Sequence, residues 1–166
     1  MIRRLMTADF CSILTIINDA AQAYRGVIPE DRWNEPYMTD EELRKEIDDG
    51  VEFFGSEKDG VLRGVMGIQN VRDATLIRHA YVLTNHQREG IGKELLNHLL
   101  KRAQTSEIFV GTWKAALWAI RFYEKNRFVL VPKAEKNRLL REYWSIPERQ
   151  VETSVVLKLN EQSAYS

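Results

Sequence analysis

Apolar residues recur at two different spacings along this chain of 166 residues. Spacings of three and four predict helices over residues 7–21 and 39–50, because such positions fall on one face of a helix. Runs rich in β-branched and aromatic residues predict strands at residues 2–5, 51–57, 61–71 and 74–83. Asp59-Gly60 joins two of these runs and is a strong signal for a β-hairpin. We therefore expect the first half of the chain to contain two helices and an antiparallel meander.

Two threonines precede the predicted helices at positions that suit an N-cap. Thr7 is followed by apolar residues at helical spacing. Thr39 is followed three residues later by Glu42, a pattern that predicts a capping box. We expect Leu43 and Ile47 to face the core from this second helix.

The second half of the chain alternates between strand-like and helix-like patterns, which indicates an α/β arrangement. A long helix with leucines at helical spacing follows residue 92, and a further helix is predicted over residues 115–125. Strands are predicted at residues 108–110, 128–131 and 152–159. A chain of this length fits one domain with a substantial core, so we assign residues 1–160 to a single domain and expect residues 161–166 to form a disordered tail.

Opposite charges balance in the composition, with 24 basic and 24 acidic residues and a pI near 6.9. This balance disfavours binding to nucleic acids or anionic membranes, which need a basic surface. Cys11 is the single cysteine, so no internal disulfide can form, and we expect it to be a small core residue. The first residues lack the long apolar stretch of a signal peptide, and we therefore expect a cytoplasmic protein.

The most informative change of pattern runs from a strand through two glycines into an amphipathic helix. Gly90 and Gly92 lie where the backbone N–H groups that begin a helix have no internal partners. The helix dipole favours an anion at this end by roughly 0.3–1 kcal/mol. Gln87, Arg88 and Lys93 add hydrogen-bond donors around the same turn. These features predict an anion site, although a tight turn without a ligand could use the same two glycines.

Two common phosphate-binding motifs do not match this stretch. Leu95 occupies the position of the third glycine in a dinucleotide-binding motif, and the Gly-Lys-Ser/Thr sequence of a P-loop does not follow. The sequence QREGIG at residues 87–92 instead resembles the pyrophosphate loop, [QR]-x-x-G-x-[GA], of the GNAT-type acetyltransferase superfamily. A second stretch, AIRFYEK at residues 119–125, resembles the A-I-x-F-Y-E-K helix of the same superfamily. This resemblance extends over residues 51–131 and implies acetyl-CoA as the cosubstrate.

The resemblance implies a mixed α/β fold, with a largely antiparallel, twisted sheet of six to seven strands and helices on both faces. Acetyl-CoA would lie in the gap between the fourth and fifth strands, with the amides of Val82 and Leu83 holding its pantetheine arm. The other cofactor-binding residues that the resemblance implies are Gln87, Arg88, Glu89, Gly90, Ile91, Gly92, Lys93, Ala119 and Phe122. We expect no metal ion, because His86 and His98 lack further ligands at a suitable spacing.

Two residues are candidates for proton transfer. Tyr123 matches the tyrosine that the superfamily uses as a general acid toward the departing CoA thiolate, and a phenol with a pKa of about 10 is protonated at neutral pH. The acceptor ammonium must lose a proton before it attacks, and His79 on the fourth strand is a candidate base. Strand alternation places His79 on one face with Ile77 and Tyr81. Glu35 or a chain of water molecules is the alternative base. Tyr123 and His79 could each instead be a core residue without a role in proton transfer.

Large aromatic residues gather in the irregular stretch of residues 25–38. Its prolines and glycine break any regular period, and we expect an ordered loop. Trp33, Glu35 and Tyr37 suit the wall of a site for a cationic or polar acceptor, so they are candidate substrate-binding residues. The alternatives are a loop that only plugs the edge of the core and an aromatic surface that forms a homodimer.

Two positions depart from the pattern of the superfamily. Ala116 replaces an asparagine that usually stands three residues before Ala119, which removes one polar contact to the cofactor. Arg127 replaces the glycine expected before Phe128, and we expect Asn126 to take the left-handed conformation that ends the helix. Neither change affects the glycine loop.

Together these patterns predict an acetyl-CoA-dependent N-acetyltransferase, an acyltransferase that moves the acetyl group to a primary amine by direct attack in a ternary complex. The amine would belong to a small molecule or a peptide. Two other interpretations stay open. The first is a catalytically weak CoA-binding module with a regulatory or scaffold role, and the second is transfer to a non-amine acceptor or of a larger acyl group.

Overall fold

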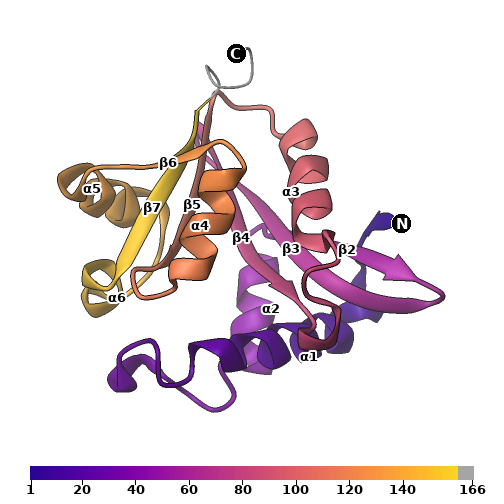
Figure 1. Ribbon diagram of the computed structural model, residues 1–166. Coiled ribbons are helices and arrows are strands. Elements are labelled where there is room, and N and C mark those ends of the chain that lie inside the picture. The colour runs from indigo at the N-terminus through magenta and orange to yellow at the C-terminus, as the bar shows by residue number, and fades with distance from the viewer. Residues whose placement is uncertain (161–166) are drawn as a thin grey trace.

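Seven strands form one sheet in the order β1-β2-β3-β4-β5-β7-β6 (Figure 1). The computed structural model describes residues 1–160, so the predicted tail at residues 161–166 lies outside the described part. The strands are β1 (Ile2–Arg4), β2 (Glu52–Lys58), β3 (Val61–Val71), β4 (Ala74–Val82), β5 (Glu107–Trp113), β6 (Phe128–Leu130) and β7 (Ser154–Leu159). Neighbouring strands are antiparallel except β4 and β5, which run parallel. The predicted class of fold, a mixed and largely antiparallel sheet, is confirmed.

Helices cover both faces of this sheet. They are α1 (Phe10–Ala20), α2 (Asp40–Asp48), α3 (Ile91–Arg102), α4 (Leu117–Lys125), α5 (Lys133–Tyr143) and α6 (Glu148–Glu152). Adjacent residues of β4 point to opposite faces, so Ile77 is buried with Leu95 of α3 whereas Leu76 is buried with Leu139 of α5. Consequently α3 and α4 cover one face, and α1, α2, α5 and α6 cover the other.

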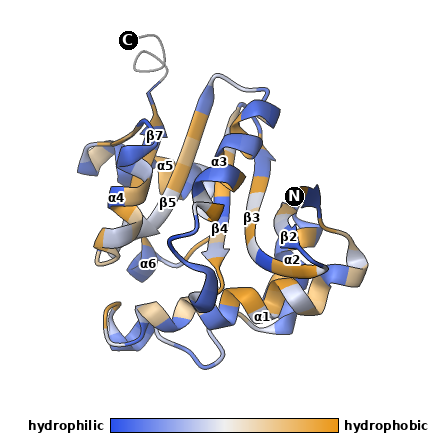
Figure 2. Cartoon of the chain, turned by 45° about the vertical axis from the view of Figure 1, so that its right-hand side comes forward, coloured by the Kyte–Doolittle hydropathy of each residue, from blue (hydrophilic) through white to orange (hydrophobic). Residues whose placement is uncertain are grey.

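The hydrophobic core follows the strands, as Figure 2 shows by residue hydropathy. Within residues 1–160, none of the helices is both long and apolar enough to cross a membrane.

The hairpin and one helix cap form as predicted. Asp59 and Gly60 both adopt left-handed backbone conformations, with φ of 53° and 77°, at the turn between β2 and β3. At the start of α2, the hydroxyl of Thr39 accepts a hydrogen bond from the N–H of Glu42 at 3.1 Å. Local turn chemistry therefore decides both structures.

The last turn of α2 is oriented differently from the prediction. Leu43 is fully buried as expected, but Ile47 is 38% exposed, so its assignment to the core is wrong. Glu46 faces the sheet instead, where its carboxylate contacts Arg78 and His79 of β4. An ion pair therefore occupies the position at which the apolar pattern favoured an aliphatic side chain.

The start of α1 also differs from the prediction. Thr7 does not cap the helix, because a 3-10 turn, Thr7–Asp9, comes first and the carboxylate of Asp9 accepts the Met6 N–H at 2.8 Å. Cys11 is exposed, so the expectation that it is a core residue is wrong. Three isoleucines on another side of α1 are the buried residues of this helix.

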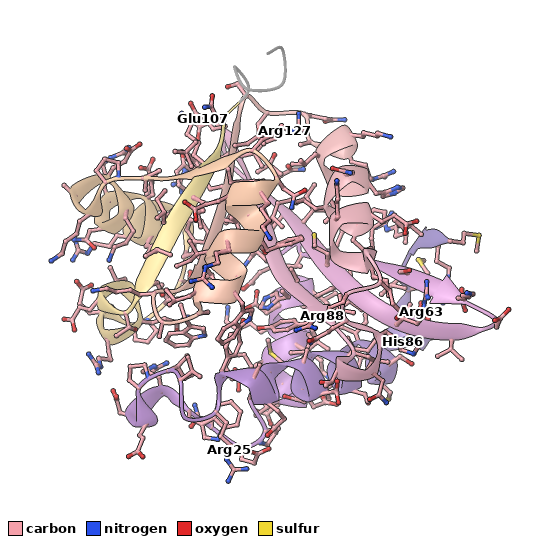
Figure 3. The ribbon with its side chains drawn as sticks, in the orientation of Figure 1. Arg25, Arg63, His86, Arg88, Glu107 and Arg127 are labelled. Carbon is pink, nitrogen blue, oxygen red and sulfur yellow. The ribbon has the colours of Figure 1, made fainter. Side chains whose placement is uncertain are left out.

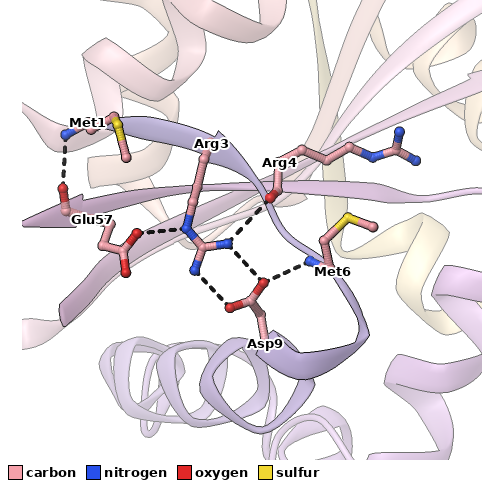
Figure 4. Close-up of polar contacts among 6 residues, drawn as sticks. All are labelled: Met1, Arg3, Arg4, Met6, Asp9 and Glu57. Carbon is pink, nitrogen blue, oxygen red and sulfur yellow. Dashed lines mark hydrogen bonds and ion pairs between the residues drawn. The ribbon is translucent and has the colours of Figure 1, made fainter. Parts of the chain in front are cut away.

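Arg3 ties the first strand to the elements beside it (Figure 4). Its guanidinium donates to both carboxylate oxygens of Asp9, at 3.0 and 2.8 Å, and to Glu57 of β2 at 2.7 Å. The hydrogen bonds from Arg3 hold the pKa of Asp9 below its ordinary value. Charge-assisted, two-point contacts of this kind are stronger than an open surface ion pair.

Replacing Asp9 by alanine is expected to lower the free energy of unfolding by about 1–2 kcal/mol, because Arg3 and the Met6 N–H both lose their partner. Urea unfolding followed by circular dichroism measures this change. Glu52→Ala removes only the exposed pair with Arg4 and is the control, with an expected cost below about 0.5 kcal/mol. Equal costs for the two variants would contradict a stabilising role for the Arg3 network.

Candidate active site

The parallel strands β4 and β5 lie side by side over only part of their length (Figure 1). Ala74 to Ile77 pair with Glu107 to Val110, and beyond these residues the two strands separate. His79 has a left-handed backbone (φ 53°) where the pairing between β3 and β4 changes register. Such a bulge bends and twists a strand, and here it accompanies the opening of a gap between β4 and β5.

Of the two cavities that border the end of β4, the larger has a volume of about 740 Å³ and lies on the face of the sheet that α3 and α4 cover. It extends from the end of β4, along the loop before α3, to the side of α4. The predicted cofactor-binding residues that line it are Val82, Gln87, Arg88, Gly90, Ile91, Gly92, Lys93, Ala119 and Phe122. His86 and Lys125 also line this cavity, and His86 and Arg88 lie on the loop that leads into α3 (Figure 3). One end of the cavity is therefore rich in cationic and hydrogen-bond-donating groups.

The two glycines have separate structural roles at this end. Gly90 has a left-handed backbone (φ 80°), a conformation that residues other than glycine disfavour. Gly92 lies against the ring of Phe122, which a Cβ at this position would approach to 3.3 Å. The N–H of Glu94 is bonded to the carbonyl of Gly90, so the N–H groups before it have no partner within the helix. These N–H groups provide an anion site at the start of α3.

A smaller cavity of about 130 Å³ lies at the gap between β4 and β5 and extends to the α5–α6 region on the opposite face of the sheet. Aromatic residues from the end of α1 and the following loop also line it, among them Tyr24 and Tyr37. The residues shared by the two cavities are Tyr24, Ala80, Tyr81, Ala119 and Tyr123. The two cavities therefore meet at the gap between β4 and β5.

Tyr123 lies at this junction and belongs to α4. Its side chain is 5% exposed, and its ring makes edge contacts with Phe122 and Phe128 at centroid distances of 5.1 and 5.6 Å. Burial raises the pKa of its hydroxyl above the ordinary value, so the phenol is protonated at neutral pH. Packing thus fixes the ring while the residue still borders both cavities.

A comparison with protein families matches residues 13–128 to the acetyltransferase (GNAT) family. The chain belongs to this family. It is therefore an acyltransferase, and its general reaction is acetyl transfer. A comparison with curated protein sequences found no match.

Solved structures with the same fold include several acetyltransferases. PaiA N-acetyltransferase from Thermoplasma acidophilum, in complex with coenzyme A, is 18% identical, with a TM-score of 0.70 over 96% of this chain and 98% of that chain. Ribosomal-protein-alanine N-acetyltransferase from Brucella melitensis is 19% identical, with a TM-score of 0.67 over 95% and 98% of the two chains. N-acetylglutamate synthase from Neisseria gonorrhoeae, complexed with coenzyme A and N-acetyl-glutamate, is 20% identical, with a TM-score of 0.66 over 96% of this chain and 34% of that chain.

Two of the residues that the GNAT resemblance assigned to the cofactor do not line the larger cavity. The N–H of Leu83 donates to the carbonyl of Arg63 at 2.9 Å, so this N–H already has a partner within the sheet, and the predicted contact of this residue with the pantetheine arm stays a prediction. The carboxylate of Glu89 lies 2.9 Å from Nδ1 of His86. Glu89 therefore braces the loop by this contact, while the residues on either side of it line the cavity.

His79 faces a different environment from the one that strand alternation predicts. Because of the bulge, it shares a face with Tyr81 but not with Ile77, and the adjacent residue Arg78 points to the same side. Its ring stacks on Phe53 at 5.9 Å between centroids. The side chain is 12% exposed and lines the smaller cavity, and its Nε2 is buried without a hydrogen-bond partner.

Charge is balanced around His79. Its Nε2 lies 3.5 Å from a carboxylate oxygen of Glu46, and Arg78 pairs with the same carboxylate at 2.9 Å. Burial lowers the pKa of His79 below its ordinary value; Glu46 opposes this shift, and the charge of Arg78 adds to it. Burial alone would raise the pKa of Glu46, but contacts with His79 and Arg78 outweigh it and the net shift is downward. At neutral pH the cluster therefore contains a neutral imidazole beside a compensated ion pair.

The loop before α2 contributes one of its three predicted residues to a cavity. Tyr37 lines the smaller cavity, and its hydroxyl accepts a hydrogen bond from Nε1 of Trp113 at 2.8 Å. Trp33 stacks on Tyr37 from outside, with centroids 5.9 Å apart. Glu35 is exposed and accepts a hydrogen bond from Gln22 at 3.2 Å. Trp33 and Glu35 therefore lie outside the lining of both cavities, whereas the loop itself is ordered as expected.

Three aromatic residues at the junction are not among the sequence candidates. Tyr24 lies within the 3-10 turn Ala21–Tyr24, where its ring packs against Tyr81 of β4 and is stacked with Trp118 of α4, at centroid distances of 6.3 and 5.9 Å. Tyr24 and Tyr81 border both cavities, and Trp118 lines the larger one. Their large size is the only sequence signal, because the fold brings them together from three distant segments.

The two departures from the family pattern have simple structural outcomes. Ala116 is fully buried with Trp113 at the start of α4. Arg127, not Asn126, takes the left-handed conformation, with φ of 74°, so that expectation is wrong. The side chain of Asn126 instead donates to the carbonyl of Phe122 at 2.7 Å and closes the end of the helix. Among residues 1–160, no group of three or more His, Cys, Asp or Glu side chains is arranged to hold a metal ion.

Proposed function

We propose that this chain transfers the acetyl group of acetyl-CoA to a primary amine by direct attack within a ternary complex. The observation that carries the proposal is the junction at Tyr123, where a long cavity with a cationic end meets a smaller aromatic cavity across the gap between β4 and β5. Two substrates that enter from opposite faces of the sheet would bring their reacting groups together at this point.

The larger cavity suits the CoA moiety. The pyrophosphate would bind the free N–H groups at the start of α3, with Arg88 and Lys93 close to its charge. The remainder of CoA would lie along α4, past Phe122 and Ala119, and would bring its thioester to Tyr123. Two solved structures of this fold contain coenzyme A, which supports this assignment.

The smaller cavity suits the acceptor amine. The names of two relatives of the same fold describe N-acetyltransferases, which supports nitrogen as the attacking atom. His79 would remove a proton from the acceptor ammonium, and the amine nitrogen would then form a bond to the thioester carbon. As the bond from carbon to sulfur breaks, Tyr123 would donate its hydroxyl proton to the departing thiolate, and the second proton, which the nitrogen loses as the amide forms, would return to the Tyr123 phenolate. The acceptor would be a small molecule or a peptide amine.

Replacing Gly90 by glutamate tests the cofactor site. Both backbone strain and a negative charge at the anion site should weaken acetyl-CoA binding, by about tenfold or more. Isothermal titration calorimetry measures the dissociation constant. Gly60→Glu is a matched control, because Gly60 also has a positive φ (77° against 80°) and no atom near its missing Cβ, but lies in the β2–β3 hairpin. Equal weakening in both variants, or no binding by the unmodified protein, would contradict the proposed site.

Turnover separates the proposal from its alternatives. A panel of primary amines and alcohols with acetyl-CoA, followed by release of free thiol, reports the acceptor class. Binding without turnover of any acceptor would favour a CoA-binding module, and turnover of alcohols alone would favour a non-amine acceptor. The same panel with propionyl-CoA and longer acyl-CoA substrates tests the size of the acyl group. Light scattering measures whether the protein forms a homodimer.

A further inference from the structure

We propose that the acceptor is a primary amine that carries no carboxylate group, and that the enzyme discriminates against free amino acids. This inference rests on the proposed function, because it concerns the acceptor that the smaller cavity would hold. The charges, the lining and the size of that cavity support it in turn.

The smaller cavity offers no free cation to a carboxylate. Among the described residues that line it, Arg78 is the one with a formal positive charge. Its guanidinium is committed to Glu46 at 2.9 Å and to the side-chain oxygen of Gln69 at 3.0 Å. The Arg78 side chain is only 16% exposed, and Glu46 already cancels its charge. A substrate carboxylate would have to compete with Glu46 for this guanidinium.

The remainder of the lining is neutral. Tyr24, Tyr37 and Tyr81 present aromatic rings and hydroxyl groups, and burial raises the pKa of each hydroxyl above the ordinary value. Trp113 adds a ring whose N–H is already bonded to Tyr37, and His79 is neutral at physiological pH. Such walls favour an aliphatic or aromatic body. A carboxylate would lose its water there and would meet only the neutral hydroxyl and amide donors of the lining, with no free positive charge to compensate it.

The volume of the cavity strengthens this restriction. About 130 Å³ admits a small acceptor, or one side chain of a larger one, with little room for water around it. The acceptor nitrogen needs one group that takes its proton, which the imidazole of His79 can supply. An amino acid brings a second charged group within two bonds of the same nitrogen, and that group would lie inside the gap.

The inference is tested by matched acceptors that differ only in the carboxylate. The pairs are phenethylamine against phenylalanine and putrescine against ornithine, with phenylalanine amide as an uncharged compound of nearly the same size as phenylalanine. Values of kcat/KM are compared per concentration of unprotonated amine. We expect each carboxylate-free member to exceed its amino acid by about ten- to hundredfold. Equal or better turnover of the amino acids would overturn the inference and leave the proposed function intact. No turnover with any amine would instead contradict the proposed function.

Glu46→Gln tests the cause of the discrimination. This variant removes the carboxylate that cancels Arg78, so the guanidinium becomes available and the preference for carboxylate-free amines should fall by about tenfold. The ratio within each pair is the readout, because any loss of stability or of general activity affects both members. Glu52→Gln, on an exposed residue of β2 that pairs with Arg4, is the control and should leave the ratio unchanged. An unchanged ratio in Glu46→Gln would overturn the role of charge compensation. The comparison of acceptors with the unmodified enzyme needs no variant and stands if Glu46→Gln fails to fold.

Discussion

Tyr123→Phe is expected to lower kcat by about a hundredfold or more while it changes the KM for acetyl-CoA by less than about threefold. The substitution removes one hydroxyl and keeps the ring that packs between Phe122 and Phe128. The departing thiolate would then lack a proton donor at the junction of the two cavities, whereas the walls of the proposed cosubstrate site are unchanged. The loss should therefore appear in the chemical step and not in binding.

Steady-state kinetics with an amine that the enzyme acetylates measures kcat and the KM for acetyl-CoA. A thermal unfolding curve verifies that the variant is folded. Tyr143→Phe is the matched control. Its hydroxyl donates to Asp73 at 2.7 Å, and the residue lies outside the lining of both cavities, so kcat should stay within about twofold. An unchanged kcat in Tyr123→Phe would remove this hydroxyl from the mechanism, and the CoA thiolate would then have to leave unprotonated or take its proton from water.

The sequence was sufficient to predict the helices and strands whose apolar residues recur at a regular spacing. Leu95 and Leu99 of α3 are fully buried, as their spacing predicts, and the β2–β3 hairpin follows from two turn residues. The helices α5 and α6 were not predicted, although they cover one face of the sheet. Their few apolar residues, such as Leu139 and Leu140, are surrounded by charged side chains, so the period is weak until the sheet supplies a partner surface.

The glycine loop could be predicted because its chemistry is local. Gly90 needs a positive φ, and the unpaired N–H groups of α3 exist in any helix that begins there. The bulge at His79 has no such local signal, because a histidine seldom has a positive φ and only the pairing with β3 reveals the change of register. The predicted alternation of side chains is therefore wrong at His79, which is the proposed base itself.

The aromatic junction is a tertiary property. Tyr24, Tyr81 and Trp118 lie on three segments that are far apart in the sequence, and their contacts arise only once α1, β4 and α4 are in place. Glu46 is a similar example, because a carboxylate in the last turn of an exposed helix gives no sign that it will pair with Arg78. The sequence thus indicated the cofactor side of the site, whose motif is contiguous, better than the acceptor side, which is assembled from separate elements.

The pH dependence of kcat should identify His79 as the base. The neutral imidazole is the active form, so kcat is expected to be constant at higher pH and to fall as the pH drops through the pKa of His79. Burial lowers this pKa, which places the midpoint below the ordinary value of about 6.5. Glu46 opposes the shift, so Glu46→Gln should move the midpoint to still lower pH, a change that a purely structural histidine would not produce.

His79→Gln is expected to lower kcat by about a hundredfold and to abolish this acidic limb, because no group in the smaller cavity replaces the imidazole as a proton acceptor at that position. Profiles are recorded with both substrates saturating, so that they report the groups in the ternary complex. His98→Gln carries the same substitution on α3, outside both cavities, and should keep the original profile. If His79→Gln retained the acidic limb, the proton would pass to another group. Glu35 would be a poor choice, because it is exposed and lies outside both cavities, and a chain of water molecules from the gap between β4 and β5 would then be the better assignment.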